Sequence, residues 1–405
     1  MSSTRKSLRV AVRRFDPFES SIRKQWSDFD ARERTGLELE LEPLDLHPLY
    51  ETTLQREGLK RGEWDSAFLN SDWFAACHSS GALLDLQPLV AADPPEGYPS
   101  AWAPNLLALQ RFGETLLGLP YHDGPECLIY RSDLFDSAAE KRAYQDRFGE
   151  KLRLPQSWRE FHQVSRFFTR PEEGLYGTAF AAFPDGHNTV YDFCLQLWTR
   201  GGELFDTQGR LTLESSEAVE ALEYYRALLN DPASVHPLSR GMDSVKSGLA
   251  FAKGEVAMMV NWFGFAAMAE TIAESKVRGK VDVAALPERP VSLNVYWILG
   301  VGSGSPHARA AYRFLRHCAS PAMDKLLTLE GGIGCRKSTW EDPEVNRTIP
   351  FYRRMGALHH GARELPRRSD WPALAAVIDR LVLDTINTQE PVRSLVARHQ
   401  RSLAG

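Results

Sequence analysis

Strands and helices alternate from residue 8 to residue 69, and this alternation is what most constrains the fold. Residues 8–12 are an apolar run, and apolar residues then recur at helical spacing until Gly36. Apolar and acidic residues alternate at 37–44, a second helical pattern covers 50–60, and residues 65–69 are a further strand pattern. This order predicts parallel strands joined by crossover helices. The sequence therefore predicts an α/β fold.

Two side chains suited to ligand contact follow the apolar run that ends at Leu69. Asp72 and Trp73 come after a short Asn-Ser turn. In open parallel sheets, ligands bind beyond the carboxyl ends of the strands. We therefore expect Asp72 and Trp73 near a binding site, with a helix N-cap as the alternative role for Asp72.

A second polar loop lies within residues 118–136. Tyr121, His122 and Asp123 stand between a Gly-Pro turn and the Gly124-Pro125 turn, and an apolar run follows at 127–130. The pattern indicates a strand, a loop with hydrogen-bonding side chains, and another strand. An exposed surface turn is the competing interpretation.

Length and charge limit the classes of protein. A chain of 405 residues exceeds the size at which one core keeps growing, so we expect two lobes. The formal charge of -5 and the scattered Lys and Arg residues argue against a nucleic-acid partner. The sequence has no apolar run long enough for a membrane helix. It also has no P-loop, dinucleotide fingerprint, nucleophile elbow or metal-ligand spacing, so we expect neither cofactor nor metal.

The N-terminus and the cysteines bear on the cellular compartment. Residues 1–15 are basic but contain no apolar core of a signal peptide, which leaves both the cytoplasm and a removed leader open. The five cysteines are isolated, so we expect buried free thiols. A Cys318–Cys335 bridge is the only pairing worth testing.

The remaining chain continues to mix helices and strands. The patterns predict helices at 155–168, 188–199, 214–229, 307–318, 322–329, 372–383 and 391–402. They predict strands at 254–260, 281–284 and 297–301.

Six blocks resemble, in order, the extracellular solute-binding proteins of ABC sugar importers, the family that includes maltodextrin-binding protein. Examples are LGLPYHDGPECLIYRSDLF, LPQSWREF and AFAKGEVAMMVNW. The blocks cover 64–89, 117–135, 154–161, 201–229, 250–262 and 305–321. Each block alone is a weak signal, but six in the family's order are a strong one.

The resemblance implies a two-lobe periplasmic binding protein type II fold with a hinged interlobe cleft. The chain of such a protein crosses between lobes about three times, here near Pro120, Asn261 and Cys318. The implied lobes are 1–120 with 262–318, and 121–261 with 319–405. Hinge residues absorb the dihedral change when such lobes close on a ligand.

The resemblance also implies a sugar or polyol ligand. Sugar hydroxyls need carboxylates and amides, and the C–H faces need aromatic rings. Residues matching the family's ligand positions are Asp72, Tyr191, Trp297 and Trp371. Further expected contacts are Trp73, His122, Asp123, Trp262 and Arg336. Trp262 stands two positions before the family's Trp, which falls near Gly264.

Each expected contact has a simpler alternative. The tryptophans are alternatively core or interdomain aromatics, Tyr191 a buried core residue, and Arg336 a surface arginine.

The implied function is non-catalytic, high-affinity binding of a mono- or oligosaccharide or polyol, by a monomer, for delivery to an ABC transporter permease. The alternatives are a cytoplasmic ligand sensor on the same fold, or a glycoside hydrolase using Asp72 and Asp123. The family is periplasmic or extracellular, and the sequence does not specify the sugar.

Overall fold

A computed structural model describes residues 6–403, apart from the side chain of Asn105. Residues 1–5, part of the stretch read for a signal peptide, lie outside the described residues. The chain divides into two units, and each is described by itself. Unit 1 comprises Met1–Gly124, Val295–Arg353 and Leu365–Ser369, and unit 2 comprises Pro125–Asn294, Arg354–Glu364 and Asp370–Gly405.

Unit 1 is built on a five-stranded sheet with the order β2-β1-β3-β11-β6. Its strands are β1 (Ser7–Arg13), β2 (Glu38–Leu44), β3 (Ser66–Asn70), β6 (Leu119–His122) and β11 (Trp297–Val301). β1 is parallel to β2 and β3, which confirms the predicted parallel start of the fold. β11 is antiparallel to both β3 and β6 and lies between them, although it comes more than 170 residues after β6 in the chain. The local sequence pattern does not predict this insertion.

The acidic alternation of β2 explains its place at the edge of this sheet. Glu38, Glu40 and Glu42 are exposed, whereas Leu39 and Leu41 are half-buried. Charged side chains on an edge strand disfavour pairing with other chains. β1, by contrast, is buried along most of its length, as its apolar run predicts.

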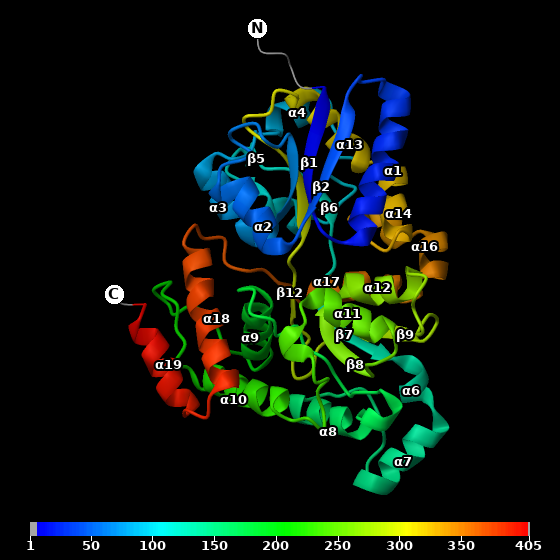
Figure 1. Cartoon of the computed structure of the whole chain (residues 1–405), viewed down its shortest axis with the longest axis vertical. Coiled ribbons are helices and arrows are strands. Elements are labelled where there is room, and N and C mark those ends of the chain that lie inside the picture. The colour runs from blue at the N-terminus through cyan, green and yellow to red at the C-terminus, as the bar shows by residue number, and fades with distance from the viewer. Residues whose placement is uncertain (1–5, 404–405) are drawn as a thin grey trace. The chain divides into compact units, whose positions relative to one another are not determined.

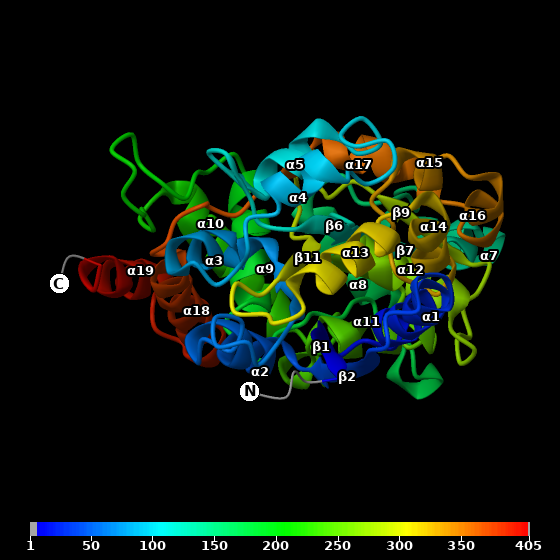
Figure 2. The same ribbon diagram turned by 90° about the horizontal axis from the view of Figure 1, so that it is seen from above.

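Helices α1 (Asp16–Glu33), α13 (Ala308–Cys318) and α14 (Pro321–Leu329) belong to unit 1 and lie near one another (Figures 1 and 2). The helical spacing seen in the sequence places Phe18, Ile22, Trp26 and Phe29 on the buried face of α1. The Trp26 ring meets Phe314 of α13 with centroids 5.1 Å apart. The apolar periodicity of α1 is therefore a core pattern.

The helix predicted at 50–60 is displaced. α2 begins at Leu46 and ends at Tyr50, and a π-helical segment continues over Glu51–Gln55. The chain then turns back so tightly that a Cβ on Gly58 would lie 2.3 Å from the carbonyl oxygen of Thr52. This close approach ends the helix, and only glycine fits there without a shift.

Unit 2 contains a three-stranded antiparallel sheet with the order β8-β7-β9. Its strands are β7 (Glu126–Arg131), β8 (Met258–Trp262) and β9 (Val281–Ala284). The main helices of unit 2 are α7 (Ala138–Phe148), α8 (Trp158–Phe168), α9 (Asn188–Thr199), α10 (Ser216–Leu229), α11 (Ser244–Ala252), α12 (Phe263–Thr271), α18 (Trp371–Asn387) and α19 (Val392–Arg401). α9, α10 and α18 pack against one another, and α19 packs on α10 and α18 (Figure 1).

Short elements complete both units. In unit 1 they are α3 (Phe74–Ser80), α4 (Gln87–Ala92), α5 (Pro104–Leu109), β4 (Arg111–Phe112), β5 (Thr115–Leu116), α15 (Lys337–Trp340) and α16 (Pro343–Thr348). In unit 2 they are α6 (Ser132–Asp136), β10 (Ser292–Leu293), α17 (Met355–His360) and β12 (Ala362–Arg363).

The unit boundaries differ from the lobe boundaries expected near 120, 261 and 318. The chain leaves unit 1 after Gly124 and returns to it at Val295. β9 pairs with β7, which keeps residues 262–294 in unit 2. α14 packs on α1, which keeps residues 319–353 in unit 1. Strand and helix pairing therefore displaces the second and third expected crossings by about thirty residues.

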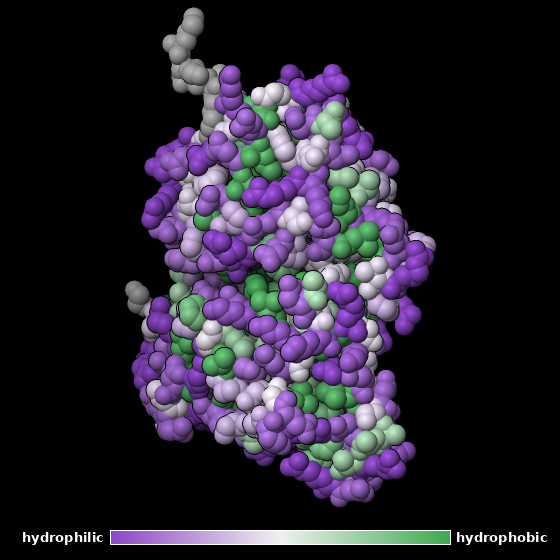
Figure 3. All heavy atoms as spheres, turned by 45° about the vertical axis from the view of Figure 1, so that its right-hand side comes forward, coloured by the Kyte–Doolittle hydropathy of each residue, from purple (hydrophilic) through white to green (hydrophobic). Residues whose placement is uncertain are grey.

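All five cysteines are free and buried, which confirms the expected thiols; Cys318 and Cys335 form no bridge. No helix within residues 6–403 is both long and apolar enough to cross a membrane. On the face shown in Figure 3, polar residues cover most of the surface and apolar residues form separate patches.

Candidate functional site

Three strand ends meet at one edge of the unit 1 sheet. Trp297, the first residue of β11, pairs with Asn70 at the end of β3 and with His122 at the end of β6. Because β11 is antiparallel to both neighbours, the loops that leave β3 and β6 start at this edge. The structure thus brings together five residues predicted as ligand contacts. We call them the sheet-edge cluster: Asp72, Trp73, His122, Asp123 and Trp297.

Aromatic contacts hold the two tryptophans of the sheet-edge cluster. The ring centroids of Trp73 and Trp297 lie 5.8 Å apart at 85°, an edge-to-face arrangement. The ring of Tyr50, at the end of α2, also packs on Trp73, with ring centroids 5.2 Å apart. Trp73 is buried, whereas Trp297 is only half-buried. Trp297 therefore retains exposed ring surface for a further contact.

Asn70 takes the capping role that was the alternative for Asp72. The Asn70 side-chain oxygen accepts a hydrogen bond from the backbone N–H of Asp72 at 3.2 Å. The N-cap interpretation of Asp72 is therefore wrong, since its neighbour caps the turn. The Asp72 carboxylate is half-buried, and its charge adds to burial in raising the pKa of Tyr50. The Asp72 carboxylate thus places acceptor oxygens at the sheet edge.

His122 is neutral and held in one tautomer. Its Nδ1 accepts a hydrogen bond from the backbone N–H of Ile333 at 2.9 Å, so the ring proton resides on Nε2. Burial lowers the pKa of His122 to about 4, although the nearby Asp123 carboxylate opposes this shift. The side chain is therefore a fixed Nε2–H donor at neutral pH. It is not an exposed turn residue.

Asp123 is tied to the same segment through its backbone. Its N–H donates to the carbonyl of Ile333 at 3.1 Å, and the side chain is buried. The Asp123 charge adds to burial in raising the pKa of Cys335 and Tyr352. The segment around Ile333 thus fixes both polar residues of the β6 loop, a role that the sequence pattern did not reveal.

Arg336 has a structural role inside unit 1. Its guanidinium donates to the carbonyls of Ala319 at 2.8 Å and Glu96 at 2.9 Å, and it lies over the Trp102 ring at 4.6 Å. The side chain is buried, so the surface-arginine interpretation is wrong. These contacts commit the guanidinium to the fold, and they do not support the predicted ligand role.

Unit 2 brings together Tyr191 and Trp262. Tyr191 is buried on α9, and its ring centroid lies 5.6 Å from that of Trp262, at the end of β8, with the planes at 85°. The ring of His187, just before α9, also packs on Tyr191, with ring centroids 6.1 Å apart. We call Tyr191, Trp262 and His187 the α9 cluster. The displaced position of Trp262 in the sequence therefore does not separate it from Tyr191.

The loop before α9 is fixed by Asp185. Its carboxylate accepts from the backbone N–H groups of His187 at 2.9 Å and Asn188 at 3.1 Å, and from the Asn188 amide at 2.6 Å. These bonds orient the start of the helix and place His187 beside Tyr191. A carboxylate before a helix start is the sequence signal that could have found this loop.

Two buried acids stand close to the α9 cluster. Glu126 begins β7 directly opposite Trp262, and burial together with the Asp192 charge raises its pKa. Burial also raises the pKa of Asp192 to about 7, although a hydrogen bond from Tyr225 at 2.5 Å lowers it. Glu126 was missed by the sequence analysis, yet an acid at the head of the apolar run ECLIY is a visible signal.

Trp371 is separate from the α9 cluster in its contacts. It is the first residue of α18 and is buried. Within residues 6–403 it makes no ring contact with Tyr191 or Trp262. Its contact with a ligand stays a prediction.

The arrangement is suited to binding a neutral polar molecule. Each cluster joins aromatic rings to fixed hydrogen-bonding groups, which suits a molecule with C–H faces and hydroxyl edges. Across the described residues, no group of three or more His, Cys, Asp or Glu side chains is placed to hold a metal ion.

Comparison with known proteins defines the class of protein. The model of the bacterial extracellular solute-binding protein family matches residues 18–325, and the chain belongs to this family. A probable ABC transporter-binding protein of Deinococcus radiodurans is 23% identical over 279 residues, 67% of this chain and 62% of that protein. A probable amino-acid ABC transporter periplasmic-binding protein of Sinorhizobium fredii, y4oP, is 26% identical over 211 residues, 52% of this chain and 47% of that protein. The matches thus span less than two thirds of either relative's length.

Solved structures share the fold over nearly the whole chain. Maltose-bound MalE3 of T. maritima has a TM-score of 0.84 at 21% identity, with 98% of this chain and 99% of that chain covered. A solute-binding protein of Agrobacterium radiobacter K84 in complex with ribitol has a TM-score of 0.86 at 22% identity, with 98% of each chain covered. These likenesses confirm the predicted fold class, and the family model confirms the predicted resemblance.

Proposed function

We propose that this protein binds a sugar or a polyol without catalysis and delivers it to an ABC transporter permease. The observation that supports this most is the pairing of aromatic rings with fixed polar groups in both the sheet-edge cluster and the α9 cluster. Trp297 offers a ring surface for C–H groups, and Asp72 and His122 offer an acceptor and a donor for hydroxyls. The maltose and ribitol complexes of proteins with this fold give the same ligand classes as a starting point.

An amino acid is the second ligand class, because the relative y4oP is named for amino-acid transport. The α-carboxylate of an amino acid is best met by a guanidinium or a set of N–H donors. The two clusters contain acids, His and aromatic residues, and Arg336 is already committed to backbone carbonyls. This composition favours a neutral polyhydroxylated ligand.

A glycoside hydrolase with Asp72 and Asp123 as its carboxylates is the enzymatic alternative. Such chemistry needs two acids flanking the scissile bond, one of them able to give or take a proton. For a binding protein, we expect that oligosaccharides incubated with it release no reducing sugar. Release that is lost in Asp72→Asn would favour the enzyme.

A thermal-shift screen over sugars, polyols and amino acids tests the ligand class. A ligand that binds only the native state, at one hundred times its dissociation constant, adds about 3 kcal/mol to the free energy of unfolding. For a protein of this size, that corresponds to a rise in Tm of about 3 °C. We expect at least one sugar or polyol to produce this rise. A screen in which only amino acids raise Tm would contradict the sugar proposal.

Other parts of the proposal are tested separately. Closure of the two units on the ligand stays a prediction, and the radius of gyration from solution scattering with and without the ligand tests it. We propose that the protein is a monomer and acts outside the cytoplasm. Light scattering and fractionation of cells that express the native gene test these two points.

A further inference from the structure

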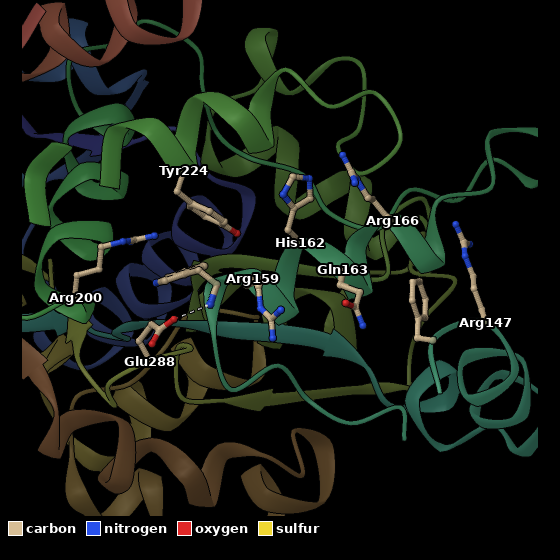
Figure 4. Close-up of a pocket in the computed structure, with 10 residues that line it drawn as sticks. Arg147, Arg159, His162, Gln163, Arg166, Arg200, Tyr224 and Glu288 are labelled. Atoms are coloured by element: carbon tan, nitrogen blue, oxygen red, sulfur yellow. Dashed lines mark hydrogen bonds between the residues drawn. The ribbon is translucent and has the colours of Figure 1, made fainter. Parts of the chain in front are cut away.

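Unit 2 contains a cavity lined by four arginines. The cavity has a volume of about 560 Å³, within the range of small-ligand pockets. Arg147 comes from α7, Arg159 and Arg166 come from α8, and Arg200 directly follows α9 (Figure 4). None of these residues belongs to the two clusters described above.

Helical spacing places part of this lining on one face of α8. Trp158, His162 and Arg166 are four residues apart along the helix, and Arg159 and Gln163 form the neighbouring row, one position further along the chain. Residues spaced by four lie on one face, and from Trp158 to Arg166 the helix rises roughly 12 Å. The cavity is therefore a groove along α8, with the Arg147 side chain at one end and that of Arg200 at the other (Figure 4).

The groove carries excess positive charge. Arg147 and Arg159 form no ion pair with any described residue, while Arg166 and His162 share the carboxylate of Asp231 at 2.6 and 2.7 Å. Glu288 is the one acid on the lining, and it accepts a hydrogen bond from the backbone N–H of Trp158 at 3.1 Å. The local charge is thus opposite in sign to the chain's formal charge of -5. An anion is the complementary occupant.

The Arg200 end offers specific hydrogen bonds. The Nη1 of Arg200 donates to the backbone and side-chain oxygens of Gln196 at 2.8 and 2.6 Å. Its Nε and Nη2 donate to no other described residue, and its carbon Cζ lies 5.1 Å from the Tyr224 ring centre. The Tyr224 hydroxyl is buried, has no hydrogen-bond partner among the described residues, and points toward the middle of the lining side chains (Figure 4). A guanidinium and a phenol together suit an oxyanion.

The aromatic rings beside these donors favour a ligand that has an apolar part as well as a negative charge. The Trp158 ring is buried 5.7 Å from that of Tyr224, so the half-buried rings of Tyr224 and of Phe148, beside Arg147, are the ones that can meet a ligand. Rings of this kind pack on flat, apolar bodies. Inorganic anions would leave this surface unused.

We propose that this groove binds a small organic anion, in which a phosphate or carboxylate group is attached to a flat, apolar body. The site is distinct from the α9 cluster, because Arg200 and Tyr191 are nine residues apart along α9, a rise of roughly 13 Å. The anion and the proposed sugar or polyol can therefore be bound by the same chain.

Calorimetric titration with phenyl phosphate tests the proposal, in a buffer without phosphate and at low salt. We expect saturable binding that weakens as salt rises, because salt screens exposed charges. Phenol lacks the anion and inorganic phosphate lacks the ring, so each should bind at least about tenfold more weakly than phenyl phosphate if both parts contribute.

Single substitutions test whether phenyl phosphate binds in this groove. Arg200→Gln should weaken phenyl phosphate about tenfold and Tyr224→Phe about threefold, the losses expected for a charge-assisted and a neutral hydrogen bond. Arg61→Gln, which removes an exposed arginine paired with Glu63 in unit 1, is the matched control and should bind as the unchanged protein does. Circular dichroism of each variant checks that it folds.

Several outcomes would overturn the proposal. These are the absence of saturable binding, equal binding of phenol or inorganic phosphate, and unchanged binding by folded Arg200→Gln and Tyr224→Phe. An equal loss in Arg61→Gln would show a general charge effect. Binding of an oligoglutamate peptide without binding of phenyl phosphate would point to a protein partner instead.

Discussion

Trp297 is the residue on which the sheet-edge cluster depends. It pairs with the last residues of two strands, and its ring packs edge-to-face on Trp73 while part of it stays exposed. Under the proposed function, this half-buried side chain is a ligand contact.

Removal of this ring tests its role. Trp297→Ala should weaken the best sugar or polyol at least about tenfold, because the stacked contact is lost. Trp297→Phe keeps an aromatic ring and should therefore weaken binding less than Trp297→Ala. Titration calorimetry measures both, and an unchanged affinity in a folded Trp297→Ala protein would exclude the residue from the site.

His122 makes a separate prediction about acid stability. Its pKa is about 4 in the folded chain and near 6.5 when unfolded. Below pH 6.5 the unfolded chain therefore binds a proton that the native chain does not, so the free energy of unfolding falls as pH drops from about 6.5 to 4. Protonation of His122 in the unfolded chain lowers the free energy of unfolding by on the order of 3 kcal/mol.

His122→Asn should flatten this part of the pH profile, since Asn keeps an acceptor for the Ile333 N–H but does not titrate. Urea unfolding at pH 7 and pH 4.5 measures the difference for both proteins. If the variant loses as much stability as the unchanged protein over this range, then His122 is not the group responsible.

At the scale of elements, the close contact of β6 and β11 fixes the position of the cluster. Gly118 lies just before β6, and a Cβ there would come within 2.5 Å of the Leu299 carbonyl oxygen and 2.7 Å of the Ile298 side chain. The two strands can therefore approach only because Gly118 has no side chain.

Gly118→Ala should push β6 away from β11. Forced overpacking of this kind costs about 1–3 kcal/mol of stability, and here it should also weaken ligand binding by moving His122. Gly241→Ala is the matched control, because a Cβ there meets nothing within 4 Å. Equal stability of the two variants in chemical denaturation would argue against the strand contact as described.

The sequence predicted individual elements better than their pairing. Apolar periodicity located α1 and β3 because burial imposes it locally. No local pattern could indicate that β11 lies between β3 and β6, since that pairing joins residues more than 170 positions apart. The end of the helix near residue 55 also depended on a close backbone approach at Gly58.

In the candidate site, too, local sequence signals could be predicted, whereas contacts between distant residues could not. Asp72 and Trp73 could be predicted because polar residues after a strand end are a local signal. Arg336 could not be interpreted correctly, because its partners Glu96 and Ala319 are distant or on another element. The grouping of Tyr191 with Trp262 likewise depends on the packing of α9 beside β8, which no local signal describes.

At the scale of the whole molecule, each of the two units carries its own aromatic and polar cluster. Family membership accounts for the fold. Under the proposed function, the choice of ligand depends on these clusters.

The most direct test is titration calorimetry of the best sugar or polyol against the unchanged protein, Trp297→Ala and Trp262→Ala. The account predicts one ligand per chain, with a loss of affinity of at least about tenfold in each variant. Full affinity in either folded variant would contradict this prediction.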